Sequence, residues 1–206
     1  PGGVITLKKV EGRWLPQSRF RPGSAFRKLH GLQGPIDDVF LEPFLVVVPS
    51  GACAHPKVDA WVQAELAHFK DRWRRLFRGE LRVKRDTEVT YEDMQQYPLV
   101  LWGDRKANVL IDRIAEHLPI AWDTSSLRVG TQTYDATHHV LACVYPNPLG
   151  QRPARSVVLN SAMTFREEHD RTNSLQIPKL PDWGILDLSE PPDAEQPGKV
   201  VDAGFF

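Results

Sequence analysis

The segment YPLVLWGDRKANVLIDRIAEHL, residues 97–118, decides the fold class of this 206-residue chain. Its uninterrupted apolar run from Leu99 to Trp102 is typical of a strand that is buried on both faces of a sheet. Gly103 lets the chain turn, and Asp104 is placed to cap a following helix. Apolar residues at helical spacing between Val109 and Leu118 then indicate that helix. A strand, a turn and a helix in this order point to an α/β fold.

The same succession occurs earlier in the chain. FLVVV, residues 44–48, predicts a second strand that is buried on both faces. Apolar residues recur every three or four positions between Val58 and Phe77, which predicts a long amphipathic helix. Pro56 suits its first turn, and Gly79 suits its C-terminal cap. We also expect a helical turn at 90–96, capped by Thr90, and further strands at 81–84, 127–135, 138–146 and 155–161. Residues 183–188 are expected to form an edge strand or to pack against the sheet.

These elements predict a mostly parallel, doubly wound sheet of the flavodoxin- or Rossmann-like kind, with helices on both faces. The connections between the last strands are too short for helical crossovers, which leaves antiparallel pairing open for them. VITLKKVEGRWL, residues 4–15, predicts an N-terminal hairpin, and the five prolines of residues 177–199 predict an extended C-terminal strap. We expect residues 1–27 to be a hairpin and linker that could end a preceding domain, and residues 28–206 to be the α/β module.

Composition excludes several classes of function. Lys plus Arg and Asp plus Glu number 26 each, so the chain has no net charge to attract nucleic acid, which leaves only a local basic patch open. The basic stretch between Arg72 and Arg85 is interleaved with acids and is interpreted as a solvated face. No apolar stretch approaches the roughly 20 residues of a membrane helix. Cys53 and Cys143 are predicted to be buried thiols, although a disulfide between them stays open.

The usual motifs of catalysis and of cofactor binding are missing from the sequence. It contains no G-x-S-x-G, no phosphate-cradling glycine loop and no G-x-G-x-x-G. Ser50 and Ser161 follow predicted strands, but each lacks the glycine that a nucleophile elbow needs. We therefore expect no catalytic residue and no cofactor.

The strand ends nevertheless offer a candidate ligand site. In a parallel sheet the carboxyl ends of the strands meet at one edge, where α/β folds bind ligands. If the predicted strands are parallel, four loops line that edge. Their candidate ligand-binding residues are Ser50, Gly103, Asp104, Asn108, Tyr145, Asn147, Asn160 and Ser161.

Three clusters of titratable residues are possible metal or acid–base sites. His138 and His139 are adjacent at the start of a predicted strand, so their side chains should point to opposite faces and could not easily share a metal ion. Glu167–Asp170 could bind a divalent ion but is interpreted as a solvated polar turn. Asp37 and Asp38 suit the first turn of a helix, which accounts for both carboxylates without a catalytic pair.

Several segments together resemble a C-terminal module of large secreted bacterial proteins of the prolyl oligopeptidase and acetyl-esterase-like type. The resemblance covers roughly residues 28–206, and one departure is visible: Ala162-Met163 stand where the pattern has Gly-His before Thr-Phe. The segments that carry it are LHGLQGPIDDVFLEPFLVVVPSG (29–51), VDAWVQAELAHFKDRWRRLFRGELRVKRDTEVT (58–90), LVLWGDRKANVLIDRIAEHLPIAW (99–122), VYPNPL (144–149), SVVLNSAMTFRE (156–167) and LPDWGILDLS (180–189).

The resemblance implies that an α/β-hydrolase domain comes first and carries the serine nucleophile and its partners. It assigns no catalytic residue to this chain, and it implies a secreted or periplasmic location. The sequence begins without Met and ends in Phe-Phe, so we expect a piece of a longer polypeptide. This predicts a non-catalytic accessory or interaction module whose partner is the hydrolase domain or chain. A stand-alone small-ligand hydrolase or binding protein, and a structural module that forms homo-oligomers, stay open as alternatives.

Overall fold

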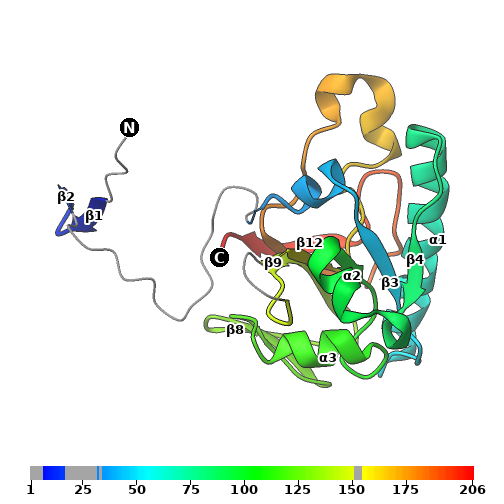
Figure 1. Ribbon diagram of the computed structural model, residues 1–206, viewed down its shortest axis with the longest axis horizontal. Coiled ribbons are helices and arrows are strands. Elements are labelled where there is room, and N and C mark those ends of the chain that lie inside the picture. Colours follow the sequence, from blue (N-terminus) through cyan, green and yellow to red (C-terminus); the bar gives the residue numbers. More distant parts are fainter. Residues whose placement is uncertain (1–6, 17–31, 33, 151–154) are drawn as a thin grey trace.

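The computed structural model describes residues 7–16, 32, 34–150 and 155–206 (Figure 1). The strands are β1 (Leu7–Val10), β2 (Arg13–Pro16), β3 (Leu45–Val48), β4 (Val83–Arg85), β5 (Leu99–Leu101), β6 (Ala121–Trp122), β7 (Ser126–Val129), β8 (Gln132–Asp135), β9 (His139–Pro146), β10 (Ser156–Leu159), β11 (Trp183–Asp187) and β12 (Lys199–Gly204). The α-helices are α1 (Pro56–Phe77), α2 (Tyr91–Gln96) and α3 (Val109–Ala115), and the short 3-10 helices are η1 (Ile36–Leu41), η2 (Asp86–Glu88), η3 (Glu167–Arg171) and η4 (Asn173–Leu175).

The central sheet has seven strands in the order β12-β11-β9-β10-β5-β3-β4. β4, β3, β5 and β10 run parallel to one another, whereas β9, β11 and β12 pair antiparallel. The pairs β1–β2, β6–β7 and β7–β8 are also antiparallel. Three strand pairs are therefore parallel and six antiparallel among the described residues, so the predicted mostly parallel, doubly wound, Rossmann-like sheet is wrong. The fold is mixed α/β.

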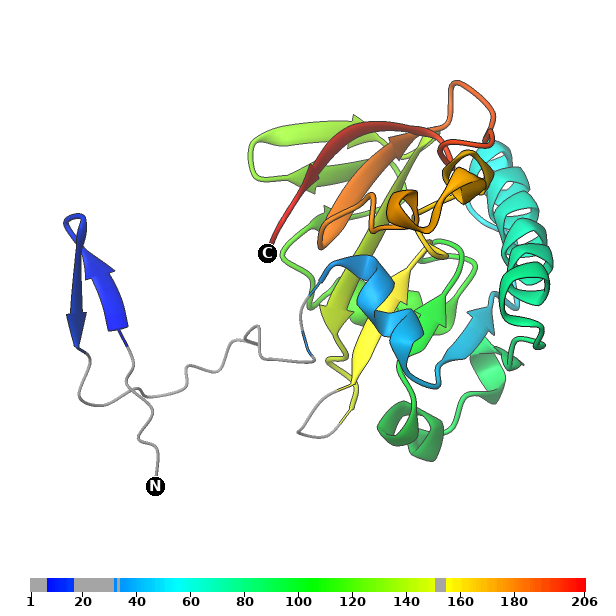
Figure 2. The same cartoon turned by 90° about the horizontal axis from the view of Figure 1, so that it is seen from above.

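The predicted strand direction is wrong for β9, β11 and β12, which form one side of the central sheet (Figure 2). β9 enters from a small three-stranded sheet, β6-β7-β8, rather than from a crossover helix, and it runs against β10. Residues 183–188 of the expected strap do form a strand, β11, but it lies between β9 and β12 and not at an edge of the sheet. The single strand expected at 127–135 is the hairpin β7–β8, which turns at Gly130 with a φ of +57°.

The core confirms that the central strands are buried on both faces. Val46, Val100 and Val158 belong to the cluster that packs on α1, and Leu45, Leu99 and Leu159 belong to the cluster that packs on α3 and the small sheet. Neighbouring residues of one strand thus pack on opposite faces of the sheet, because successive side chains of a β-strand alternate between the two faces. α1 and α3 lie on opposite sides of the sheet (Figure 1).

The helix ends follow the sequence in part. Thr90 and Asp93 form the expected capping box of α2. The C-cap of α1 is Arg78, which takes the left-handed conformation (φ 57°), so the expectation that Gly79 is the cap was wrong by one residue. Asn108, and not Asp104, caps α3, because its Oδ1 accepts hydrogen bonds from the Leu110 and Ile111 amides.

The N-terminal part is only partly described. β1 and β2 form the expected hairpin and pair only with each other among the described strands. The boundary proposed at residue 27 lies outside the described residues, so the division into 1–27 and 28–206 stays a prediction. Within the described part, no helix is long and apolar enough to cross a membrane.

Candidate functional site

Three of the four predicted loops meet at one edge of the sheet. β3, β5 and β10 are parallel, so Ser50, Gly103–Asp104 and Asn160–Ser161 follow them at their carboxyl ends. β9 is antiparallel to β10, with Pro146 opposite Ser156, so Tyr145 and Asn147 lie at the other edge. The strand-end interpretation was therefore wrong for these two residues. Tyr145 instead packs edge-on against Phe206, with ring centroids 5.3 Å apart, and burial raises its pKa.

Asn160 joins three strands at this edge. It is 2% exposed and has a φ of 47°, in the left-handed region that asparagine tolerates. Its Oδ1 accepts from the Gly103 amide at 2.8 Å, and its Nδ2 donates to the carbonyls of Gly103 (2.9 Å) and Leu141 (3.3 Å). The side chain thus links β10 to the ends of β5 and β9, which is a structural use of a residue predicted to bind a ligand.

The other polar residues after β5 also satisfy backbone groups. Asp104 accepts from the amides of Lys106 and Ala107 through Oδ1, and from the amide of Ala54 at 2.6 Å through Oδ2. Asn108 is fully buried and donates to the Trp102 carbonyl. Gly103 has a φ of +112°, and an added Cβ would lie 3.3 Å from the Ala107 side chain, so the turn requires glycine.

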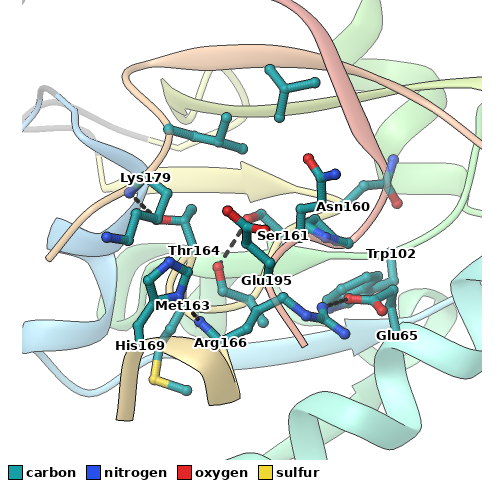
Figure 3. A pocket seen from close by; sticks show the side chains of 15 residues that line it. Glu65, Trp102, Asn160, Ser161, Met163, Thr164, Arg166, His169, Lys179 and Glu195 are labelled. Atoms are coloured by element: carbon teal, nitrogen blue, oxygen red, sulfur yellow. Dashed lines mark hydrogen bonds and ion pairs between the residues drawn. The ribbon is translucent and has the colours of Figure 1, made fainter. Parts of the chain in front are cut away.

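A pocket of about 160 Å³ opens beside Asn160 and Ser161 (Figure 3). Ser161 Oγ donates to the Ala162 carbonyl at 2.8 Å. His169 Nδ1 accepts from the Arg166 amide at 3.0 Å. Each group is therefore engaged with the backbone, and no hydrogen bond joins Ser161 to His169 among the described residues. The pocket is also smaller than the ~300 Å³ at which sites for drug-sized ligands begin.

The floor of the pocket contains a buried ion pair. Arg166 Nη1 lies 2.7 Å from Glu65 Oε2, and the two side chains are 7% and 4% exposed. Arg166 Nε also donates to the Asp193 carbonyl. Residues after 161 that line the pocket include Met163, Thr164, Arg166, Lys179 and Glu195. They were missed because this segment has no periodicity that predicts which side chains face inward.

The acidic pair Asp37–Asp38 and the Glu167–Asp170 cluster do not converge on a site. Asp37 accepts from both the amide and the hydroxyl of Thr164, and burial raises its pKa. Asp38 is exposed on η1. The four residues of the 167–170 cluster each have their own partner: Glu167 bonds to His68, Glu168 to Arg171, His169 to the Arg166 amide and Asp170 to Arg72.

The pairing of Arg72 with Asp170 corrects the interpretation of the basic stretch as a solvated face for this residue alone, since Arg74, Arg75, Arg78, Arg82 and Arg85 are exposed. Arg72 is buried on α1, and both of its Nη atoms donate to Asp170. Hydrogen bonding from Arg72 lowers the pKa of Asp170 below its usual value of 3.8. The carboxylate form of Asp170 therefore contributes stability above pH ~4, and this contribution is lost as the pH falls through the lowered pKa.

We expect Asp170→Asn to reduce the loss of stability on acidification. Urea midpoints of the wild type should fall more steeply between pH ~5 and pH ~2 than those of the variant, because the variant lacks the group whose pKa changes on folding. Asn173→Ala, which alters a neutral exposed side chain nearby, should leave the wild-type profile in place. If the urea midpoints of Asp170→Asn and of the wild type fall equally steeply with pH, the pair between Arg72 and Asp170 does not account for the loss of stability in acid.

Both cysteines are buried free thiols, as predicted. Burial raises the pKa of Cys53 to about 12 and that of Cys143 further still. Since the thiolate is the nucleophilic form, neither is activated for covalent chemistry at neutral pH.

A second surface feature, which the sequence analysis missed, is an aromatic groove of about 370 Å³. The rings of Phe44 and Trp73 pack edge to face with their centroids 4.9 Å apart, and the centroids of Trp73 and Phe77 are 4.3 Å apart. A line of rings therefore runs from the core to the surface. Leu41 is 85% exposed and Phe77 52% exposed. The groove lining is Phe40, Leu41, Glu42, Pro43, Phe44, Trp73, Glu80, Leu81 and Arg82.

Apolar residues near the two termini differ in their exposure. Trp14 and Phe205 are exposed, Phe206 packs on Tyr145, and residues 4 and 5 lie outside the described part.

Comparison with protein-family models, with curated proteins and with solved structures found no match for this chain.

Proposed function

We propose that this chain is a non-catalytic accessory module of a secreted serine hydrolase polypeptide, of the peptidase- or esterase-like type that its sequence resembles. The observation that carries the proposal is the aromatic groove beside η1 and the C-terminal end of α1. The groove lining combines aromatic rings with Leu41, which is 85% exposed, and large apolar side chains of this kind are suited to docking a partner. The module therefore acts through docking, and its partner is the α/β-hydrolase domain.

The groove has the anatomy of a protein-binding surface. Its centre is aromatic: Phe44 lies in the core, Trp73 packs against it, and Leu41 beside them is exposed. Its rim is charged, but the rim charges have partners: Glu42 lies 3.0 Å from Arg155, and Glu80 lies 2.7 Å from Arg74. An apolar centre inside a satisfied polar rim is typical of interfaces in which a few large side chains supply most of the binding energy.

The two serines that follow β3 and β10 support a non-catalytic role for the module. Ser161 donates to a backbone carbonyl, and Ser50 is exposed in the loop after β3. Nucleophilic catalysis needs a base within hydrogen-bond reach of the hydroxyl. The chemistry is then supplied by the hydrolase domain, as the resemblance implies.

A comparison of polypeptides of different length tests this division of labour. This chain, its Ser50→Ala and Ser161→Ala variants, and a longer polypeptide that includes an upstream hydrolase domain are assayed on short acyl esters and aminoacyl anilides. We expect hydrolysis only by the longer polypeptide, and unchanged by Ser161→Ala within it. Hydrolysis by this chain alone, abolished by either serine substitution, would overturn the proposal.

Docking is tested separately by binding of this chain to the hydrolase domain expressed on its own. Leu41→Asp and Leu41→Lys should each weaken binding at least about tenfold, because they place a charge at the exposed apolar side chain of the groove. Ile177→Asp is the matched control, since Ile177 is 54% exposed but lies outside the groove. Equal binding by all three variants would exclude the groove as the interface.

A second candidate function is binding of a small ligand in the pocket beside Asn160 and Ser161. The observation that favours it is the set of polar side chains around a 160 Å³ space, among them His169 and Lys179. In this case a Ser161→Trp substitution, which fills the pocket, would abolish ligand binding and leave docking to the hydrolase domain intact.

A further inference from the structure

His138, His139 and Asp187 come together at the start of β9. His139 is the first residue of β9 and pairs directly with Asp187, the last residue of β11. One potential ligand atom from each of the three residues lies within 4.8 Å of the others. His138 precedes the strand, so the alternation expected to separate the two imidazoles does not apply, and their ring centroids are 4.4 Å apart.

The surroundings hold these side chains in place. His139 Nδ1 lies 2.9 Å from the Asp135 carbonyl, which can only accept, so Nδ1 carries the proton and Nε2 keeps its lone pair. Thr137 Oγ1 lies 2.9 Å from His138 Nδ1. Asp187 Oδ1 accepts from the amide and the hydroxyl of Ser189, at 2.8 and 2.6 Å. Orientation of ligands by such outer hydrogen bonds is characteristic of metal sites.

We propose that His138, His139 and Asp187 form a binding site for a divalent transition metal ion of the Zn²⁺ class. Two imidazole nitrogens and one carboxylate oxygen match the ligands that Zn²⁺ takes, whereas Ca²⁺ and Mg²⁺ prefer oxygen alone. The three groups are half-buried, so solvent can reach the metal and complete its coordination.

The proposed metal ion has a structural role and does not act on a substrate. The cavity that adjoins His139, lined also by Gly103, Asp104 and Asn160, measures only about 10 Å³, which is about the size of one water molecule. The ion would instead join the first residue of β9 to the last residue of β11, beside the turn that leads in from β8. Metal binding would therefore stabilise the antiparallel half of the sheet.

Calorimetric titration of the tag-free chain, stripped of metal with a chelator, tests the site with Zn²⁺ alone. We expect one Zn²⁺ per chain and an increase in Tm on binding. His139→Ala and Asp187→Asn should each weaken binding at least about tenfold and remove the Tm increase. Asp187→Asn preserves the shape of the side chain, so it keeps the test decisive if His139→Ala fails to fold.

His117→Ala is the matched control, because His117 is exposed and lies outside the cluster. It should leave the stoichiometry and affinity at the wild-type values. The proposal is overturned if the wild-type chain binds no Zn²⁺, if Asp187→Asn binds as well as the wild type, or if His117→Ala weakens binding as much as the cluster variants.

Discussion

Replacing Asn160 with alanine is expected to destabilise the protein by at least about 4 kcal/mol. The substitution removes three buried hydrogen bonds at once, to the amide and carbonyl of Gly103 and to the carbonyl of Leu141. Each buried backbone group that loses its partner costs about 1–3 kcal/mol. Alanine must also adopt the left-handed conformation at φ 47°, which costs about 1–2 kcal/mol more. The free energy of unfolding in urea measures the loss.

Two further substitutions at position 160 separate these contributions. Asn160→Gly removes the side chain but accepts the positive φ, so it should be about 1 kcal/mol more stable than Asn160→Ala. Asn160→Asp keeps the acceptor for the Gly103 amide but loses both bonds that Nδ2 donates. If Asn160→Ala costs less than about 1 kcal/mol, the side chain does not hold the strand ends as described.

The sequence predicts the central strands well because their burial leaves a direct signal. FLVVV and PLVLW are apolar at every position, and the structure places alternate residues of each in the two core clusters. The helix at 56–77 could be predicted equally well, since its apolar residues recur with the period of an α-helix. Local patterns of this kind record which faces are buried.

Strand direction has no such local signal. The run from His139 to Pro146 is as apolar as a parallel strand, and nothing within it shows that it runs against β10. The direction follows from the small sheet β6-β7-β8, which occupies the place of a crossover helix and brings the chain in from the opposite edge. The wrong direction in turn misplaced Tyr145 and Asn147, whereas Gly103, Asp104, Asn160 and Ser161 were correctly placed at one edge.

The predicted site residues also show why polarity at a strand end is weak evidence for a ligand site. Asp104, Asn108 and Asn160 were chosen because they are polar and follow buried strands. In the structure each bonds to backbone amides in a loop, at a helix start or at a strand end, respectively. A buried backbone group needs a partner whether or not a ligand binds, so the same residue types serve both purposes.

The second large effect is expected at the ion pair between Glu65 and Arg166. Arg166→Met should destabilise the protein by about 3–5 kcal/mol, because it leaves the Glu65 carboxylate buried and unpaired. It also removes the donor to the Asp193 carbonyl, which ties residues near 193 to the pocket floor. Asp71→Asn, which breaks the exposed pair with Arg75, is the control and should cost less than about 1 kcal/mol.

The double variant Glu65→Leu with Arg166→Met shows whether the cost of Arg166→Met comes from leaving the Glu65 carboxylate buried without a partner or from the other contacts of Arg166. If the cost of Arg166→Met comes mainly from the unpaired Glu65, removing both charges should restore much of the lost stability, since apolar replacements of a buried pair are often close to neutral. A double variant no more stable than Arg166→Met would instead attribute the cost to the Asp193 contact and to packing. The pair would then matter through the shape of the pocket floor, and its two charges would contribute little to stability.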